Sequence, residues 1–224
     1  MRFNLGIAEL SVAVRSYSAL STRQQRLWRA VRWLFPRRMR FFFEGSLQLP
    51  GQLWYADRFV MYHTVRQLQP EHVFEVGTWN GGGSTLFIAQ ALHDNGRGVV
   101  HTVEADPTLY QTAVAAYGRY FPHLLPHVDF QQGFSTERLP ALLKQIRRVN
   151  CVFLDGLGAE STLGDFRMFE PQMGEGSVLM AHDWFDEKMA LLRPQLERSP
   201  DWLVEQVITP PESVGFAVLR RYGH

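Results

Sequence analysis

The sequence predicts an α/β fold, a doubly wound and mostly parallel seven-stranded sheet that ends in an antiparallel hairpin. Three observations predict it. From residue 70 onward, short runs rich in Val, Phe and Leu alternate with segments of helical period, as in βαβ units. The last two apolar runs are joined by too few residues for a crossover, so they should pair antiparallel. Hydrophobic residues make up 46% of the 224 residues, which is enough for one sizeable core.

The elements are expected in the following order. A helix comes first, over 56–68, because no helix breaker occurs before Pro70. Five strands linked by four helices follow, and Ser, Pro or Thr stands at the start of each linking helix. A further helix and two last strands complete the domain. The strands are expected near 72–77, 98–104, 127–132, 150–155, 177–182, 202–208 and 216–219, and the helices near 84–94, 107–118, 136–147, 161–170 and 186–198.

Residues 1–48 form a basic extension that differs from the α/β domain expected over 49–224. Residues 1–40 hold nine arginines and a single acid, Glu9, so the net charge of +1 hides a basic start and an acidic remainder. Residues 23–35 are expected to form an amphipathic helix that Pro36 ends. Its apolar face would carry Leu27, Trp28, Val31, Leu34 and Phe35, while Trp33 falls among the arginines.

Composition excludes several classes of protein. A net charge of +1 argues against a nucleic-acid partner for the chain as a whole. The one cysteine, Cys151, can form neither an internal disulfide nor a thiolate metal cluster. No stretch reaches the roughly 18 apolar residues of a membrane-spanning helix. A cytoplasmic location is therefore expected, although an Arg-rich, acid-poor start is also typical of an organelle transit peptide.

The strongest motif runs from Val73 to Thr85. An apolar strand that contains Glu75 leads into four glycines within seven residues, and a helix is expected to begin near Ser84. Glycine lets backbone approach a ligand closely, and a helix N-terminus adds oriented N–H groups. A tight turn without a ligand is the alternative. Since the spacing G-x-G-x-x-G is absent, the loop does not favour NAD.

Charged residues also end the next strands. Glu104 closes the second strand, 27 residues after Gly77, where a carboxylate can accept both hydroxyls of a ribose; an exposed strand-end acid is the alternative. Asp155, His182 and Asp183 end two neighbouring strands and should converge. Two carboxylates and an imidazole suit Mg²⁺ or another divalent ion. Without a metal, the acids would cap helices or bind substrate and His182 would act as a base. The other histidines have no partners at ligand spacing, so most of them are expected to be surface or core residues.

The stretch from Val73 to Thr85 resembles motif I of the class I S-adenosylmethionine (SAM)-dependent methyltransferases. It is most similar to the macrocin O-methyltransferase and cephalosporin-hydroxylase-like group, and more distantly to catechol O-methyltransferases. The resemblance covers roughly residues 50–220 and implies the Rossmann-like methyltransferase fold for the domain over 49–224. It implies cofactor contacts at Glu75, Gly77, Thr78, Gly81, Gly82, Ser84 and Asp155, adenine contacts at Phe134 or Ser135, and metal ligands at His182 and Asp183.

Two positions depart from the group's pattern. The loop has one more glycine at residues 81–83, and Leu157 to Glu160 follow Gly156 where the group commonly carries a histidine. Ser135 can equally be a helix N-cap.

The reaction that the resemblance implies is methyl transfer from SAM to a hydroxyl of a small molecule, a sugar or a natural-product-like compound, with help from a divalent metal. Asp155, His182 and Asp183 would handle the hydroxyl proton. Rival hypotheses are an NAD-dependent or aminopropyl-transferring enzyme on the same fold, and a non-catalytic adaptor. Enzymes of this fold often dimerise through N-terminal helices, so a homo-oligomer is expected. Peripheral membrane contact through residues 23–43 is the alternative.

Overall fold

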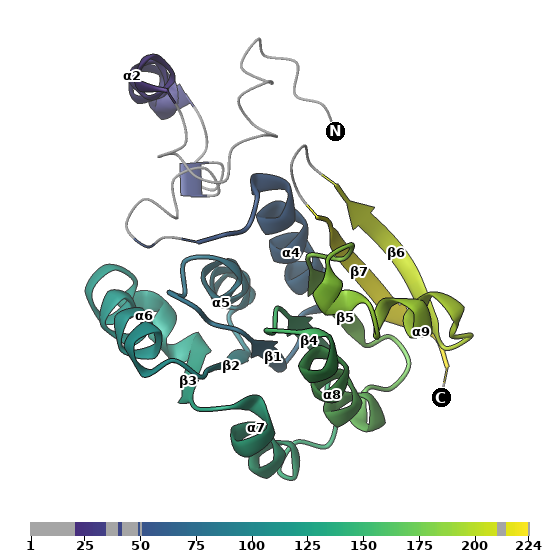
Figure 1. The fold of residues 1–224 in the computed structure, drawn as a ribbon. Helices are drawn as coiled ribbons and strands as arrows, with labels where there is room; N and C mark the ends of the chain where they lie inside the picture. Colours follow the sequence, from purple (N-terminus) through teal and green to yellow (C-terminus); the bar gives the residue numbers. More distant parts are fainter. Residues whose placement is uncertain (1–20, 35–39, 42–48, 50, 210–213, 224) are drawn as a thin grey trace.

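The computed structural model describes residues 21–34, 40–41, 49, 51–209 and 214–223. Within these residues, seven strands form one sheet in the order β3-β2-β1-β4-β5-β7-β6 (Figure 1). Strands β1 to β5 run parallel, and β7 pairs antiparallel with both β5 and β6. The predicted doubly wound, mostly parallel sheet with a C-terminal antiparallel hairpin is confirmed.

Each strand ends within two residues of its predicted bounds. The strands are β1 His72–Val76, β2 Val99–Glu104, β3 Val128–Gln132, β4 Cys151–Leu154, β5 Val178–His182, β6 Trp202–Ile208 and β7 Phe216–Arg221. The α-helices of the described residues are α2 Thr22–Val31, α4 Tyr55–Leu68, α5 Ser84–Asn95, α6 Pro107–Tyr120, α7 Ser135–Leu143, α8 Ala159–Phe169 and α9 Arg193–Arg198. Short 3-10 turns are η2 Arg32–Leu34, η4 Pro122–His127, η5 Glu170–Gln172 and η6 Glu187–Met189.

One predicted helix is wrong. The segment 186–198 was expected to be a continuous helix, but it forms the 3-10 turn η6 and, after a break, the short helix α9. Pro194 lies at the start of α9. Proline has no N–H, and its ring crowds the carbonyl four residues earlier, so Pro194 suits the first turn of α9 and disfavours one helix over 186–198.

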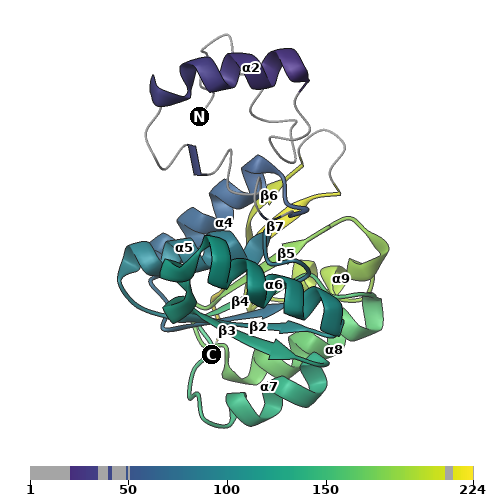
Figure 2. The same cartoon turned by 90° about the vertical axis from the view of Figure 1, so that its left-hand side faces the viewer.

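Helices cover both faces of the sheet (Figures 1 and 2). Side chains of α4, α5 and α6 share one hydrophobic cluster with alternate strand residues such as Val73. Side chains of α7, α8 and α9 share the other cluster with strand neighbours such as Phe74. Because the central strands are buried on both faces, their polar groups can reach a ligand only at the strand ends.

Helix α2 lies outside these two layers (Figure 2). Ser21 caps it through a reciprocal capping box with Gln24. Of the predicted apolar face, Trp28 is buried, whereas Leu27 and Leu34 are 49% and 62% exposed, and Phe35 lies outside the described residues. In the described part of the chain, no helix is both long and apolar enough to cross a membrane.

Candidate active site

The carboxyl ends of β1 and β4 form the centre of the site. From β1, successive strands are added outward to β3 on one side, and from β4 they are added to β5 on the other. Loops that follow the strands therefore diverge at this point and leave a crevice, which is where open α/β sheets bind ligands. The two strand ends stay in register, because Val76 pairs with Leu154 and the N–H of Asp155 donates to the carbonyl of Val76 at 3.0 Å.

The glycine loop is packed against protein on one side. A Cβ at Gly77, whose φ is +98°, would lie 2.6 Å from the carbonyl oxygen of Asp155. A Cβ at Gly81 would lie 3.1 Å from the ring of Tyr117, and one at Gly51 would lie 2.3 Å from the carbonyl oxygen of Gly82. Gly81 and Gly82 are accordingly buried and shape the loop, while Gly77, Trp79 and Asn80 are partly exposed and can be reached by a ligand.

Glu75, Thr78 and Ser84 lie beneath this loop. The hydroxyls of Thr78 and Thr102 share a hydrogen bond below the loop, so the Thr78 side chain is already used. Ser84 begins α5 and is buried. Glu75 is fully buried, and the hydroxyl of Thr85 donates to its Oε2 at 2.6 Å, whereas its Oε1 has no hydrogen-bond partner. Burial raises the pKa of Glu75 to about 7.

Glu104 lies at the end of β2 and fastens the glycine loop. Its Oε2 accepts a hydrogen bond from the N–H of Trp79 at 2.7 Å, and its Oε1 accepts one from the N–H of Asp106 at 2.9 Å. Trp79 adopts a left-handed backbone, with φ of +49°, in making this contact. A carboxylate has about four acceptor positions, so about two remain for the hydroxyls of a diol.

The loop after β3 shows which of the two candidate residues is available to contact the adenine. Phe134, which occupies the N-cap position of α7, is 58% exposed and therefore available to a planar ring. The hydroxyl of Ser135 donates to Oδ1 of Asp165 at 2.5 Å and ties α7 to α8. Ser135 is therefore neither the N-cap nor a free ligand, and Phe134 is the better candidate.

Four titratable side chains meet beyond the ends of β4 and β5. Nδ1 of His182 lies 3.3 Å from Oδ1 of Asp155 and 3.3 Å from Oδ2 of Asp183. Among the described residues, these three form the group of acids and histidines whose ligand atoms come within 4.8 Å of one another. Nζ of Lys188 contacts the same Oδ1 of Asp155 and lies 2.8 Å from Oδ2 of Asp183. The expected convergence therefore holds, but it includes a lysine that sequence reasoning missed.

Burial and charge oppose each other in this cluster. Burial alone would raise the pKa of Asp155, but the hydrogen bonds and charges of His182 and Lys188 hold it below its usual value. Burial alone would lower the pKa of His182, yet Asp155 and Asp183 raise it. Burial likewise opposes the charge of Lys188, whose pKa the two carboxylates raise. The cluster therefore favours an ionised Asp155 beside the ammonium group of Lys188.

The donor set can be compared with the needs of a metal. Two carboxylates and an imidazole have the chemistry that a hard divalent cation requires. However, the ammonium of Lys188 already lies against the carboxylate oxygens that face His182, so an ion bound there would have to displace it. The site as it stands does not fit a metal ion and Lys188 together.

Sequence reasoning also missed Asp57 and Arg58 at the start of α4. Both are buried, at 0% and 1% exposure. Oδ2 of Asp57 accepts from the N–H of Trp54 at 3.2 Å, and Oδ1 has no hydrogen-bond partner. Burial raises the pKa of Asp57 to about 6, although the nearby charge of His182 lowers it. Adjacent Asp and Arg at a helix start look like a solvated turn, so the sequence carries no signal of this burial.

The remaining histidines were expected to be surface or core residues, and two of them form a row with an aspartate across the sheet. Nδ1 of His72 lies 3.0 Å from Nε2 of His101, and Nδ1 of His101 lies 2.9 Å from Oδ2 of Asp129. The three residues stand side by side on β1, β2 and β3. Their row lies away from the carboxyl ends, so it belongs to the packing of the sheet and not to the crevice.

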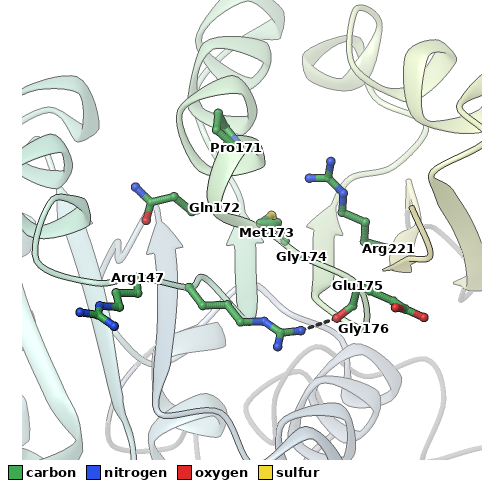
Figure 3. A pocket seen from close by; sticks show the side chains of 9 residues that line it. Arg147, Pro171, Gln172, Met173, Gly174, Glu175, Gly176 and Arg221 are labelled. Carbon is green, nitrogen blue, oxygen red and sulfur yellow. Dashed lines mark hydrogen bonds between the residues drawn. The ribbon is translucent and has the colours of Figure 1, made fainter. Parts of the chain in front are cut away.

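A hollow of about 800 Å³ lies at the opposite edge of the sheet, before β4 and β5 (Figure 3). Arg148 donates a hydrogen bond to the carbonyl of Glu175. Arg221 donates one to the carbonyl of Glu170 at 2.6 Å. These guanidinium groups therefore donate to backbone carbonyls of the chain. The candidate catalytic residues lie at the opposite, carboxyl ends of the strands. The hollow is lined by Arg147, Arg148, Pro171, Gln172, Met173, Gly174, Glu175, Gly176 and Arg221.

Known proteins agree with this geometry. Residues 74–184 match a family model described as a methyltransferase domain. No curated protein matches the chain in sequence. The chain is similar in fold to the O-methyltransferase TomG from Streptomyces achromogenes, involved in tomaymycin synthesis and solved in complex with SAM (17% identity, 76% of this chain, 82% of that chain, TM-score 0.65). A similar fold occurs in an O-methyltransferase from Bacillus cereus in complex with S-adenosylhomocysteine (SAH) (16% identity, 74% of this chain, 80% of that chain, TM-score 0.60). It also occurs in a methyltransferase from Geobacter sulfurreducens (16% identity, 88% of this chain, 97% of that chain, TM-score 0.59).

The antiparallel β7 between β5 and β6 distinguishes this sheet from a dinucleotide-binding sheet, which would continue with another parallel crossover. With the glycine loop, it defines the fold of the class I SAM-dependent methyltransferases. Within that fold, residues 74–184 match a methyltransferase domain.

Proposed function

We propose that the protein transfers the methyl group of SAM to a hydroxyl of a small molecule. The observation that carries the proposal is the meeting of Asp155, His182 and Asp183 beside the glycine loop, where a hydroxyl proton can be removed next to the cofactor crevice. The similar folds of TomG and of the Bacillus cereus enzyme, both described as O-methyltransferases, support oxygen as the acceptor atom.

The residues of the crevice fit SAM. Glu75, Gly77 and Thr78 would hold its methionine part, since Glu75 has a buried oxygen without a hydrogen-bond donor that an amino group can supply. Glu104 would accept the ribose hydroxyls, and Phe134 would contact the adenine. When bound, SAM supplies a methyl carbon that its sulfonium already activates, so the protein has mainly to orient the acceptor and remove its proton.

His182 is the proposed base. Its Nδ1 faces two carboxylates, so Nδ1–H donates to them and Nε2 is left to accept a proton. The hydroxyl proton would pass to Nε2, and SAM would supply the methyl group to the acceptor oxygen and leave as SAH. Asp155 and Asp183 stabilise the resulting imidazolium.

The mouth of the site favours an acceptor with apolar surface. Leu157 follows Asp155 by two residues and is 92% exposed, and Phe185 follows Asp183 by two residues and is 52% exposed. Exposed apolar side chains beside a charged cluster suit a ligand that is mostly apolar with a few polar groups. Within our proposal, a natural-product-like hydroxyl compound therefore fits better than a free sugar.

The test uses the full chain, labelled SAM and a panel of phenols, polyketide-type alcohols and sugars. Acceptor-dependent SAH formation is expected, and His182→Ala should lower its rate by about 10²- to 10⁴-fold, the usual contribution of a general base. His93→Ala, at an exposed position on α5, is the control and should leave the rate unchanged. Methylation at nitrogen or carbon, or full activity of His182→Ala, would contradict the proposal.

Metal-assisted transfer is the second candidate. The close approach of the Asp155, His182 and Asp183 ligand atoms favours it. Its test is chelation: turnover would stop when divalent ions are removed and would return with Mg²⁺ or Mn²⁺.

A further inference from the structure

We infer that Lys188 supplies the fixed positive charge of this active site, in the position that a divalent cation would otherwise occupy. The catalytic part of this inference rests on the proposed methyl transfer. Its structural part rests on shared atoms: Nζ of Lys188 contacts Oδ1 of Asp155 and lies 2.8 Å from Oδ2 of Asp183, the oxygens that also face His182.

The two carboxylates need a cation between them, and Lys188 already supplies one. Two carboxylates that stand this close repel each other unless a cation lies between them. Lys188 is only 11% exposed and the two carboxylates about a quarter exposed, so little water is available to screen them. A divalent ion beside a buried ammonium would add repulsion at the same oxygens.

The residue type also fits this role. Of the 23 basic residues in the chain, two are lysines, Lys144 and Lys188, and the others are arginines. An ammonium is a compact charge that carries three donors and can sit between carboxylates as a metal ion does, whereas a guanidinium is a planar fork.

The backbone after β5 holds Lys188 in place. Asp183 takes a left-handed conformation with φ of +54°, and a turn follows in which the N–H of Asp186 donates to the carbonyl of Asp183 at 2.9 Å. The side chain of Asp186 then accepts from the N–H of Lys188 at 3.1 Å. Met189 is 1% exposed and anchors the next residue in the core. The chain thus turns back over the strand end and returns the lysine to the carboxylates.

This arrangement gives Lys188 a direct part in the reaction. Asp155 and Asp183 use two of its three donors. The third donor is left for the acceptor oxygen, which gains negative charge as its proton moves to His182. A preorganised cation at that oxygen stabilises the developing charge in the way that a bound metal would.

The test measures Mn²⁺ binding, by electron paramagnetic resonance and calorimetry, to the full chain and three variants. The wild-type protein and Lys144→Ala, a change at the exposed lysine, should not bind Mn²⁺ in this cluster. Lys188→Ala vacates the position and should bind one Mn²⁺ at least tenfold more tightly than wild type. Adding Asp183→Asn should abolish that binding, because asparagine tolerates the left-handed backbone and removes only the charge.

Each outcome decides the inference. One Mn²⁺ bound by the wild-type protein and lost in Asp183→Asn would overturn it, and so would equal binding by wild type and Lys188→Ala. Circular dichroism checks the fold, and Lys188→Met keeps the alkyl stem if the alanine variant unfolds. Since Mn²⁺ binding needs no acceptor, its failure would leave methyl transfer untouched. Once an acceptor is known, wild-type turnover should survive a chelator, and Lys188→Ala should lose at least a hundredfold in rate under the same conditions.

Discussion

Glu104 is the single residue on which cofactor affinity should depend most. Glu104→Ala removes the proposed acceptor of the ribose hydroxyls and the hydrogen bond to Trp79, so SAH binding should weaken by about 1.5 to 3 kcal/mol, the usual loss for a hydrogen bond to a charged group. Isothermal calorimetry with SAH measures it. A variant that binds SAH as tightly as the wild-type protein would show that Glu104 does not contact the cofactor.

The neighbouring Asp106 provides a matched control for that measurement. Its carboxylate caps α6 by accepting from the N–H groups of Thr108 and Leu109 at 2.7 and 3.0 Å. Asp106→Ala should therefore cost about 1 kcal/mol of stability and leave SAH affinity unchanged. The two variants separate cofactor contact from damage to the fold.

Glu75 should make stability depend on pH. Burial raises its pKa from 4.5 to about 7, so the folded protein holds this proton more tightly than the unfolded chain. The stability that this bound proton contributes is fully present below about pH 4.5. It is lost as the pH rises through about 7, and the total loss in the free energy of unfolding is up to about 3 kcal/mol. Glu75→Gln stays neutral and should be the more stable protein in urea unfolding at about pH 8.5, with little difference near pH 4.5. Parallel pH profiles for the two proteins would contradict this.

At the level of single residues, sequence reasoning works where a side chain directly ends a strand. Asp155, His182 and Glu104 could be placed because parallel strands bring their carboxyl ends to one edge. Lys188 could not be placed, because it reaches the same edge only through a turn after β5 whose path depends on the left-handed Asp183. The rarity of lysine in this chain was the one available signal.

At the level of elements, hydrophobic period predicted the strands well and the helix ends less well. Strands such as β5 match their expected bounds within one residue because all their residues are buried, and burial sets the length of the apolar run. The segment 186–198 failed because its apolar spacing fits a helix while Pro194 disfavours a continuous one. The spacing of apolar residues alone does not reveal such a break in a helix.

Two glycines at element ends provide a test of the contact between β1 and β4. Gly77→Ala forces a Cβ to 2.6 Å from the carbonyl of Asp155 at φ of +98°, so it should cost more than about 2 kcal/mol and weaken SAH binding. Gly96→Ala also lies at positive φ, +71°, but meets nothing within 4 Å, so it should cost about 1 kcal/mol with SAH affinity unchanged. Urea unfolding and calorimetry on both variants measure these changes, and equal losses would show that the strand-end contact is unimportant.

At the scale of the whole molecule, we propose that the N-terminal extension makes a protein contact in a homo-oligomer. Leu27 and Leu34 are exposed on α2 and η2, in a basic segment beside an acidic domain. Deleting residues 1–40 should therefore convert an oligomer into a monomer in light scattering. Salt-sensitive co-sedimentation with anionic vesicles that the same deletion abolishes would instead favour contact with a membrane surface.

The place of β7 has a consequence for the synthesis of the protein. β7 is the last strand of the sheet to leave the ribosome, yet it lies between β5 and β6. Until it emerges, the edge of β5 stays open and β6 has no neighbour to pair with. An open strand edge is a template for association between chains, so nascent chains halted before residue 216 should be prone to aggregate. The half of the sheet that carries His182 can thus be completed only after the rest of the domain has been made.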